Sequence, residues 1–95
     1  MNDFHNYKPK SEREKNLFKA FLKLKSEQEI ANFLRDLLTV KELEEFANRL
    51  EMARLLKKGM PYLKIAQKLG VSTTTVTRTA HWLKRGSGGY EKVLK

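Results

Sequence analysis

Residues 60–85 read M-P-Y-L-K-I-A-Q-K-L-G-V-S-T-T-T-V-T-R-T-A-H-W-L-K-R, and this stretch decides the fold. Apolar side chains at helical spacing predict one helix from about Pro61 to Gly70, where a glycine suits the left-handed residue that ends a helix. Ser72 is a good N-cap for a second helix, which we expect over residues 73–85. Two helices joined by so tight a turn indicate a helix-turn-helix.

The second predicted helix has two unlike sides. We place Val76 at the centre of the buried side and advance about 100° per residue. The residues that share its side are then Thr79, Ala80 and Leu83. The opposite side is polar and basic, and it consists of Thr74, Thr77, Arg78, His81 and Arg85. Such a side suits a helix that enters the major groove of DNA, although an ordinary helical hairpin with a solvated outer side has the same pattern.

The positive charge of the chain is concentrated in its second half. The 95 residues carry a net charge of +9, of which residues 57–95 contribute +8 with nine basic side chains and one acidic. Residues 1–56 hold eleven basic and ten acidic side chains. A basic excess that coincides with a groove-reading helix indicates a nucleic-acid binder. We therefore expect double-stranded DNA as the partner. Docking to another protein, and nucleoid or RNA binding without sequence preference, are the alternatives.

Other classes of function find little support in the sequence. Without cysteine there is neither a disulfide framework nor a thiolate metal site, and we expect no metal. No apolar run approaches the ~20 residues of a membrane span, and the N-terminus lacks the apolar core of a signal peptide. We therefore expect a cytoplasmic protein associated with the bacterial nucleoid. His5 and His81 lie in different segments without a catalytic motif, so we expect no enzyme.

The remaining segments predict further helices and no strand. The expected elements are helices over residues 11–25, 26–38 and 39–58, a glycine-rich joint at residues 86–89 and a short amphipathic tail at residues 90–95. Each of the three helices opens with Ser or Thr followed three residues later by Glu, the spacing of a capping box. Residues 1–10 are expected to form a mobile arm ahead of a single all-α domain of about six short helices over residues 11–95.

The predicted helices also bear on the oligomeric state. They are short and apolar, and they need more partner surface than one chain of 95 residues offers. A groove-reading protein gains when two recognition helices lie one DNA turn apart. We therefore expect a homodimer whose first, third and last helices pack against the partner, with a compact monomer as the alternative.

Three segments resemble the tryptophan repressor family. They are L-L-T-V-K-E-L-E-E-F-A-N-R-L-E at residues 37–51, L-L-K-K-G-M at residues 55–60 and L-G-V-S-T-T-T-V-T-R at residues 69–78. The ending H-W-L-K-R-G-S-G-G-Y-E-K-V-L at residues 81–94 looks like the YerC/YecD branch of that family. The resemblance implies an intertwined all-α homodimer and a transcriptional regulator, which we expect to be a repressor.

The resemblance also implies a candidate effector pocket. In the repressor proper two arginines hold an amino-acid corepressor, and the matching positions are Arg49, with a one-residue gap near Gly59, and Arg78. Thr79 and Trp82 stand where the repressor has small residues that make room for the indole. We expect no cofactor, with Trp82 either filling the pocket and stacking on a guanidinium or packing at the dimer interface. L-tryptophan or a related amino-acid effector is the alternative.

The candidate DNA contacts fall into three groups. The basic side chains expected to meet phosphates, which supply affinity rather than sequence information, are Lys57, Lys58, Lys64, Lys68, Lys84 and Arg85. The hydroxyls expected at a phosphate or a base edge, at the start of the second helix, are Ser72, Thr73 and Thr74. The side chains expected to face bases are Thr77, Arg78 and His81. Consecutive threonines favour thymine methyl contacts and water-mediated readout over bidentate reading of guanine.

Overall fold

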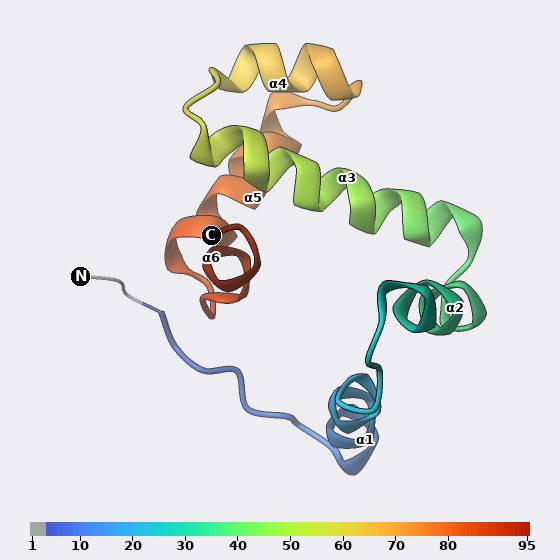
Figure 1. Ribbon diagram of the computed structural model, residues 1–95. Coiled ribbons are helices and arrows are strands. Elements are labelled where there is room, and N and C mark those ends of the chain that lie inside the picture. Colours follow the sequence, from blue (N-terminus) through green and yellow to red (C-terminus); the bar gives the residue numbers. More distant parts are fainter. Residues whose placement is uncertain (1–3) are drawn as a thin grey trace. The chain divides into compact units, whose positions relative to one another are not determined.

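The structure, a computed structural model, describes residues 4–95 and builds them into six helices (Figure 1). The helices are α1 (Glu12–Phe21), α2 (Glu27–Leu37), α3 (Val40–Lys57), α4 (Tyr62–Leu69), α5 (Thr73–Arg85) and α6 (Gly89–Val93). The described residues contain no strand, which confirms the predicted all-α class. Residues 1–3 of the predicted mobile arm lie outside the described range. No helix within that range is both long and apolar enough to cross a membrane.

Three of the helices begin at the predicted capping boxes. The side-chain oxygens of Ser11, Ser26 and Thr39 each accept a hydrogen bond at 3.1 Å from the backbone N–H three residues on. At Thr39 the box is reciprocal, because the Glu42 carboxylate accepts from the Thr39 N–H at 2.9 Å. That bond holds the pKa of Glu42 below its ordinary value. At the two serines the glutamate accepts instead from the residue before the cap. These bonds satisfy N–H groups that have no partner inside a helix.

The first helix ends earlier than the sequence predicted. α1 stops at Phe21 rather than continuing to Lys25. The backbone N–H groups of the next three residues donate to carbonyls three residues back, at 3.1–3.2 Å, and this tighter pattern closes the helix. Leu22 is 82% exposed as a result. The chain then turns extended at Ser26, which begins α2.

Contacts divide the chain into two compact units, and one of them contains the helix-turn-helix. It comprises residues 4–6 and 45–95. Its buried core consists of Met52, Leu55, Ile65, Ala66 and Val76, with Leu56, Met60, Leu69 and Val71 packed against it. Ile65 of α4 and Val76 of α5 are fully buried. The core therefore fixes α4 and α5 against each other and against the C-terminal part of α3.

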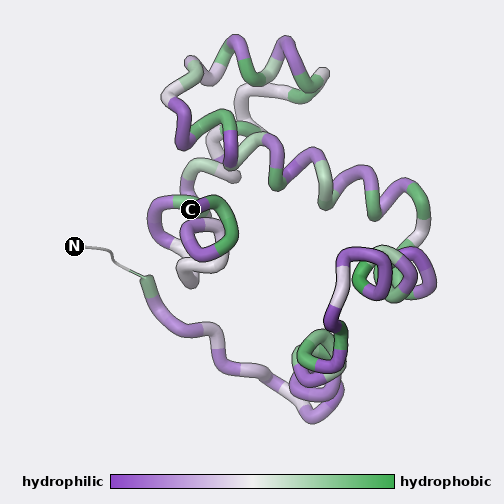
Figure 2. The backbone as a smooth tube through the Cα atoms, viewed as in Figure 1, coloured by the Kyte–Doolittle hydropathy of each residue, from purple (hydrophilic) through white to green (hydrophobic). Residues whose placement is uncertain are grey.

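The other unit comprises residues 7–44, and none of its residues is buried. Its helices α1 and α2 meet through the rings of Phe21 and Phe33, which lie edge to face with centroids 5.4 Å apart. Tyr7 lies edge to face with Phe18 of α1, at 6.2 Å. Figure 2 shows hydrophobic and hydrophilic residues following one another along both helices. Both are amphipathic, and their apolar sides stay partly exposed.

The segment before α1 has no helix over residues 4–10 but makes defined contacts. The backbone N–H of His5 donates to the Gly86 carbonyl at 3.3 Å. Gly88 has φ +84°, and a Cβ there would lie 3.0 Å from the Phe4 ring. The glycine therefore permits both the left-handed backbone and the close approach of that ring. The mobility of residues 4–10 stays a prediction.

Candidate nucleic-acid interface

The turn between α4 and α5 has the predicted helix-turn-helix geometry. Gly70 adopts a left-handed backbone with φ 67°, a conformation that glycine takes without steric penalty. The N–H groups of Gly70 and Val71 both donate to the Ala66 carbonyl, the second at 3.0 Å. The Ser72 hydroxyl oxygen then accepts from the Thr75 N–H at 3.1 Å and caps α5. The glycine turn and the serine cap are both confirmed.

The two sides of α5 separate as the helical periodicity predicted. The buried residues are Val76, Thr79, Ala80 and Leu83. Thr79 is the polar member of this set, and its hydroxyl donates to the Met52 sulfur at 3.8 Å. Thr79 stands where the tryptophan repressor has a small residue. Its hydroxyl is therefore bonded inside the protein rather than free to bind a ligand.

All the side chains predicted to contact DNA are exposed; they are Lys57, Lys58, Lys64, Lys68, Ser72, Thr73, Thr74, Thr77, Arg78, His81, Lys84 and Arg85. Two of the hydroxyls already make local bonds. Thr77 donates its proton to the Thr73 carbonyl at 2.9 Å, so toward a base it presents a methyl group and acceptor lone pairs. Ser72 is committed to the helix cap, and its hydroxyl also lies 3.0 Å from that of Thr75. Its structural role therefore exists without DNA.

The predicted phosphate-contacting lysines are not equivalent. The Lys57 ammonium bonds the Glu91 carboxylate at 3.2 Å and so joins the end of α3 to α6. No ion pair within residues 4–95 engages Lys58, Lys64 or Lys68. The charge of Lys57 is already partly compensated by this direct contact. Lys58 and Lys68 act on the Glu51 carboxylate only through longer-range electrostatics, so they and Lys64 remain available to an incoming anion.

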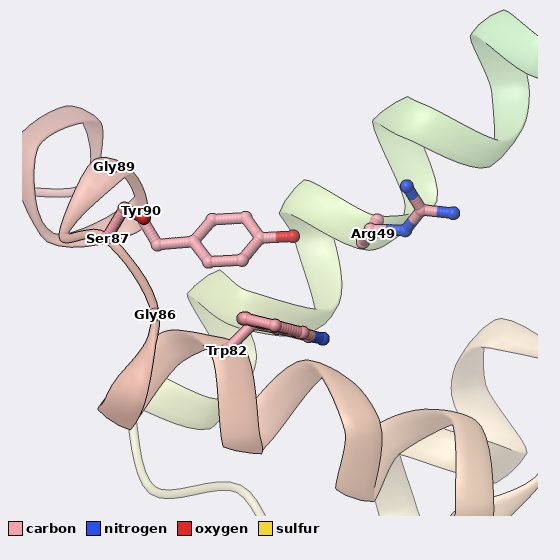
Figure 3. A pocket seen from close by; sticks show the side chains of 6 residues that line it. All are labelled: Arg49, Trp82, Gly86, Ser87, Gly89 and Tyr90. Atoms are coloured by element: carbon pink, nitrogen blue, oxygen red, sulfur yellow. The ribbon is translucent and has the colours of Figure 1, made fainter. Parts of the chain in front are cut away.

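An aromatic cavity lies beside α5, where the effector pocket was expected. Its volume is about 450 Å³, and it is lined by Arg49, Trp82, Gly86, Ser87, Gly89 and Tyr90. Figure 3 shows the rings of Trp82 and Tyr90 extending from α5 and α6 toward α3, which carries Arg49. Burial raises the pKa of Tyr90, and the nearby charge of Arg49 opposes that shift.

A second cavity of about 310 Å³ shares Arg49, Trp82 and Tyr90 with the first and is also lined by Thr75, Arg78 and Thr79. The four predicted pocket residues, Arg49, Arg78, Thr79 and Trp82, thus line one cavity. Trp82 borders both cavities and remains 61% exposed. Its ring lies edge to face with His81, at 5.2 Å. The cation–π contact found among residues 4–95 joins Arg49 to Phe46 and does not involve Trp82.

Two tyrosines that the sequence analysis did not assign to the site lie at its border. Tyr90 lines both aromatic cavities, although the sequence indicated only an apolar residue in an amphipathic tail. Tyr62, the first residue of α4, lines a smaller hollow beside α5. Its place directly after Pro61, at the start of the first helix of the motif, is the signal that could have identified it. The described part of the chain contains no group of three or more side chains able to hold a metal ion.

Comparison of the sequence with known proteins gives two matches. The sequence model described as Trp repressor protein matches residues 12–95. The chain is also 41% identical over 78 residues to the uncharacterized protein YerC of Bacillus subtilis (strain 168), an alignment that covers 82% of this chain and 75% of that one.

Crystal structures of related proteins share the fold. A TrpR-like protein from Eubacterium eligens ATCC 27750 superposes with a TM-score of 0.81 at 37% identity, over 88% of this chain and 87% of that chain. A candidate Trp repressor from Staphylococcus aureus superposes with a TM-score of 0.80 at 34% identity, over 90% and 85% of the two chains. Both similarities extend well beyond the helix-turn-helix.

Proposed function

The chain belongs to the Trp repressor protein family, and on that premise we propose that it is a transcriptional regulator, a repressor, that binds specific double-stranded DNA sequences through α4 and α5. The observation that carries the proposal is the division of α5 into a buried apolar side and an exposed side of hydroxyl and basic groups. A helix held rigidly by its apolar side can present the other side to the major groove. Such a regulator works in the cytoplasm on the bacterial nucleoid.

The contacts divide by their chemistry. Lys58, Lys64 and Lys68 are exposed, form no ion pair with the described residues, and serve the phosphate backbone, which sets affinity and salt dependence. Arg78 and His81 donate to base edges, while Thr77 offers its methyl group to thymine.

We propose that two copies form this regulator. α1 and α2 contain no buried residue, and large apolar side chains along them are 37% to 48% exposed; they are Leu17, Phe18, Phe21, Ile30 and Leu37. On α3, Val40, Phe46 and Leu50 are also exposed. Apolar surface of this extent on a small chain favours burial against a partner. Through α1, α3 and α6 a second copy would cover it and bring a second recognition helix to the DNA.

We propose further that DNA binding needs no amino-acid corepressor. Thr79 fills space next to α3 and bonds Met52, and Trp82 lies at the wall of the cavity that Arg49 and Arg78 border. Trp82 then takes the place of a ligand ring, or packs at the dimer interface. Calorimetric titration with L-tryptophan should give no heat of binding. Micromolar binding would contradict this and make the cavity an effector site.

Selection of bound fragments from random DNA tests the main proposal. We expect a palindromic motif whose half-sites lie about one helical turn apart, because two symmetric recognition helices read adjacent major grooves. Enrichment without a motif would indicate a general nucleoid or RNA binder. No retention of DNA at 150 mM salt, roughly the physiological ionic strength, would indicate a protein-interaction module.

An enzymatic function has no support from the site. The His81 ring lies edge to face with Trp82 and lines a hollow beside Tyr62, Lys84 and Arg85, surroundings that suit the binding of an anion. We therefore propose a binding function alone.

A further inference from the structure

A small hollow lies where the start of α4 meets the last turns of α5. Its volume is about 210 Å³, and its lining residues are Tyr62, Thr77, Ala80, His81, Lys84 and Arg85. It shares none of these residues with the two cavities around Arg49. It is therefore a separate feature, built by side chains of both helices of the motif.

The lining of the hollow is chemically one-sided. Lys84 and Arg85 bring two positive charges, and the described part of the chain contributes no carboxylate to the lining. Among residues 4–95, no side-chain hydrogen bond or ion pair engages Tyr62, Lys84 or Arg85. A set of free donors with positive charge suits an anion that offers several oxygen acceptors.

The remaining lining residues limit what the hollow can recognise. Ala80 is nearly fully buried and supplies an apolar floor. The Thr77 hydroxyl proton is already donated to the Thr73 carbonyl, so Thr77 does not donate to a ligand. The donors that remain are the hydroxyl of Tyr62 and the nitrogen groups of His81, Lys84 and Arg85.

We propose that this hollow receives one phosphate of the DNA backbone, and that Tyr62 donates its hydroxyl hydrogen bond to that phosphate. The inference rests on the proposed function and deepens it by adding a docking subsite. Thr77 and His81 belong both to the hollow and to the exposed side of α5, so the phosphate would lie directly beside the bases that α5 faces. Contacts from α4 and α5 to one phosphate would fix the rotation of α5 in the groove.

The test compares three single variants on the duplex obtained from random-DNA selection. Tyr62→Phe removes only the hydroxyl, and we expect affinity to fall about threefold to tenfold with an unchanged salt slope, because a neutral donor is lost. Lys84→Ala should lower the salt slope by about one. Tyr7→Phe is the control in residues 7–44. It removes a hydroxyl that donates to Glu14 at 2.7 Å, and its DNA affinity should equal that of the unchanged protein.

A double variant and a modified duplex locate the phosphate. Tyr62→Phe combined with Lys84→Ala should lose less affinity than the product of the single losses, because both groups serve one phosphate. The second experiment uses a series of duplexes, each with one backbone phosphate replaced by a neutral methylphosphonate. At one position the replacement should lower the affinity of the unchanged protein but should not lower the affinity of Lys84→Ala any further.

The outcomes separate the inference from the function it rests on. If the unchanged protein binds no duplex, the proposed function fails and the subsite fails with it. If it binds and Tyr62→Phe matches Tyr7→Phe, the subsite is wrong while the function stands. If Tyr62→Phe weakens binding to a polyglutamate peptide but not to DNA, the hollow serves an acidic protein partner, and the inference is overturned.

Discussion

The helix-turn-helix unit and residues 7–44 have similar proportions of apolar residues but bury them differently. In the first, Ile65 and Val76 are fully buried, and eight apolar residues are buried in all, five of them in the core cluster. In the second, no residue is buried, although α1 and α2 carry apolar sides of their own. Figure 2 shows hydrophobic residues in both parts of the chain.

The difference indicates that the helices of the two units depend on different packing partners. Isolated short helices are marginal in water, and helices in proteins gain most of their stability by packing an apolar side. The helix-turn-helix unit contains its own packing partner, the C-terminal part of α3. Residues 7–44 contain capped helices whose apolar sides stay partly exposed. We propose that a second copy of the chain packs against them.

The sharpest way to break the comparison is an equal truncation in each unit. Ile65→Ala, at a fully buried site, should destabilise the protein by about 2–5 kcal/mol, because it leaves a cavity in the core cluster of the helix-turn-helix unit. Leu17→Ala on α1, where the side chain is 37% exposed, should change the unfolding of a single chain far less. Urea unfolding of both variants measures the difference.

Self-association gives the second half of that test. Leu17→Ala should weaken dimer formation in analytical ultracentrifugation, whereas Ile65→Ala acts through folding. Equal losses of stability at every protein concentration would show that α1 is not covered by a partner, and would remove the basis of the comparison.

Removal of a helix cap should have a smaller effect. Ser72→Ala and Ser26→Ala each delete a hydroxyl that accepts a backbone N–H at 3.1 Å, and each should cost about 1 kcal/mol of stability. Only Ser72→Ala should also weaken DNA binding, because it loosens the start of α5. Thermal melts and mobility shifts on the two variants separate the effects, and equal DNA affinities would contradict the assigned role of α5.

The lysines test the electrostatic side of the helix-turn-helix unit. Lys64→Ala should weaken binding to all duplexes and lower the salt slope by about one, since Lys64 is exposed and has no ion-pair partner among residues 4–95. Lys57→Ala should change the slope less, because Lys57 already bonds Glu91 at 3.2 Å. Fluorescence anisotropy over a salt series measures both slopes. An unchanged slope for Lys64→Ala would remove that residue from the interface.

The smallest expected effect is on the stability of the fold at acidic pH. The backbone N–H of Thr39 lowers the pKa of Glu42, so the folded state binds fewer protons than the unfolded one in the ordinary glutamate range. The stabilisation is complete above that range and is lost as the pH falls through the lowered pKa. Glu42→Gln should therefore flatten the acid limb of the stability curve slightly, with Glu44→Gln as control. Identical curves for the two variants would show that the cap of α3 contributes nothing measurable.

The sequence predicted local features better than tertiary ones. The Ser and Thr caps, Gly70 and the buried side of α5 follow from the chemistry of neighbouring residues, and all are found. The end of α1 at Phe21 was missed because nothing in residues 22–25 marks a stop. Partners far apart along the chain carry no local signal. The bonds from Lys57 to Glu91 and from Thr79 to Met52, and the meeting of Tyr62 with α5, therefore needed the structure.

The bond from His5 to Gly86 bears on the order in which contacts form during folding. It joins two residues that lie 81 positions apart along the chain, so it forms only after the segments between them have come together. Contacts this distant along the chain are slow to form compared with those inside the α4–α5 hairpin. The hairpin should therefore form first, and the N-terminal segment should dock last.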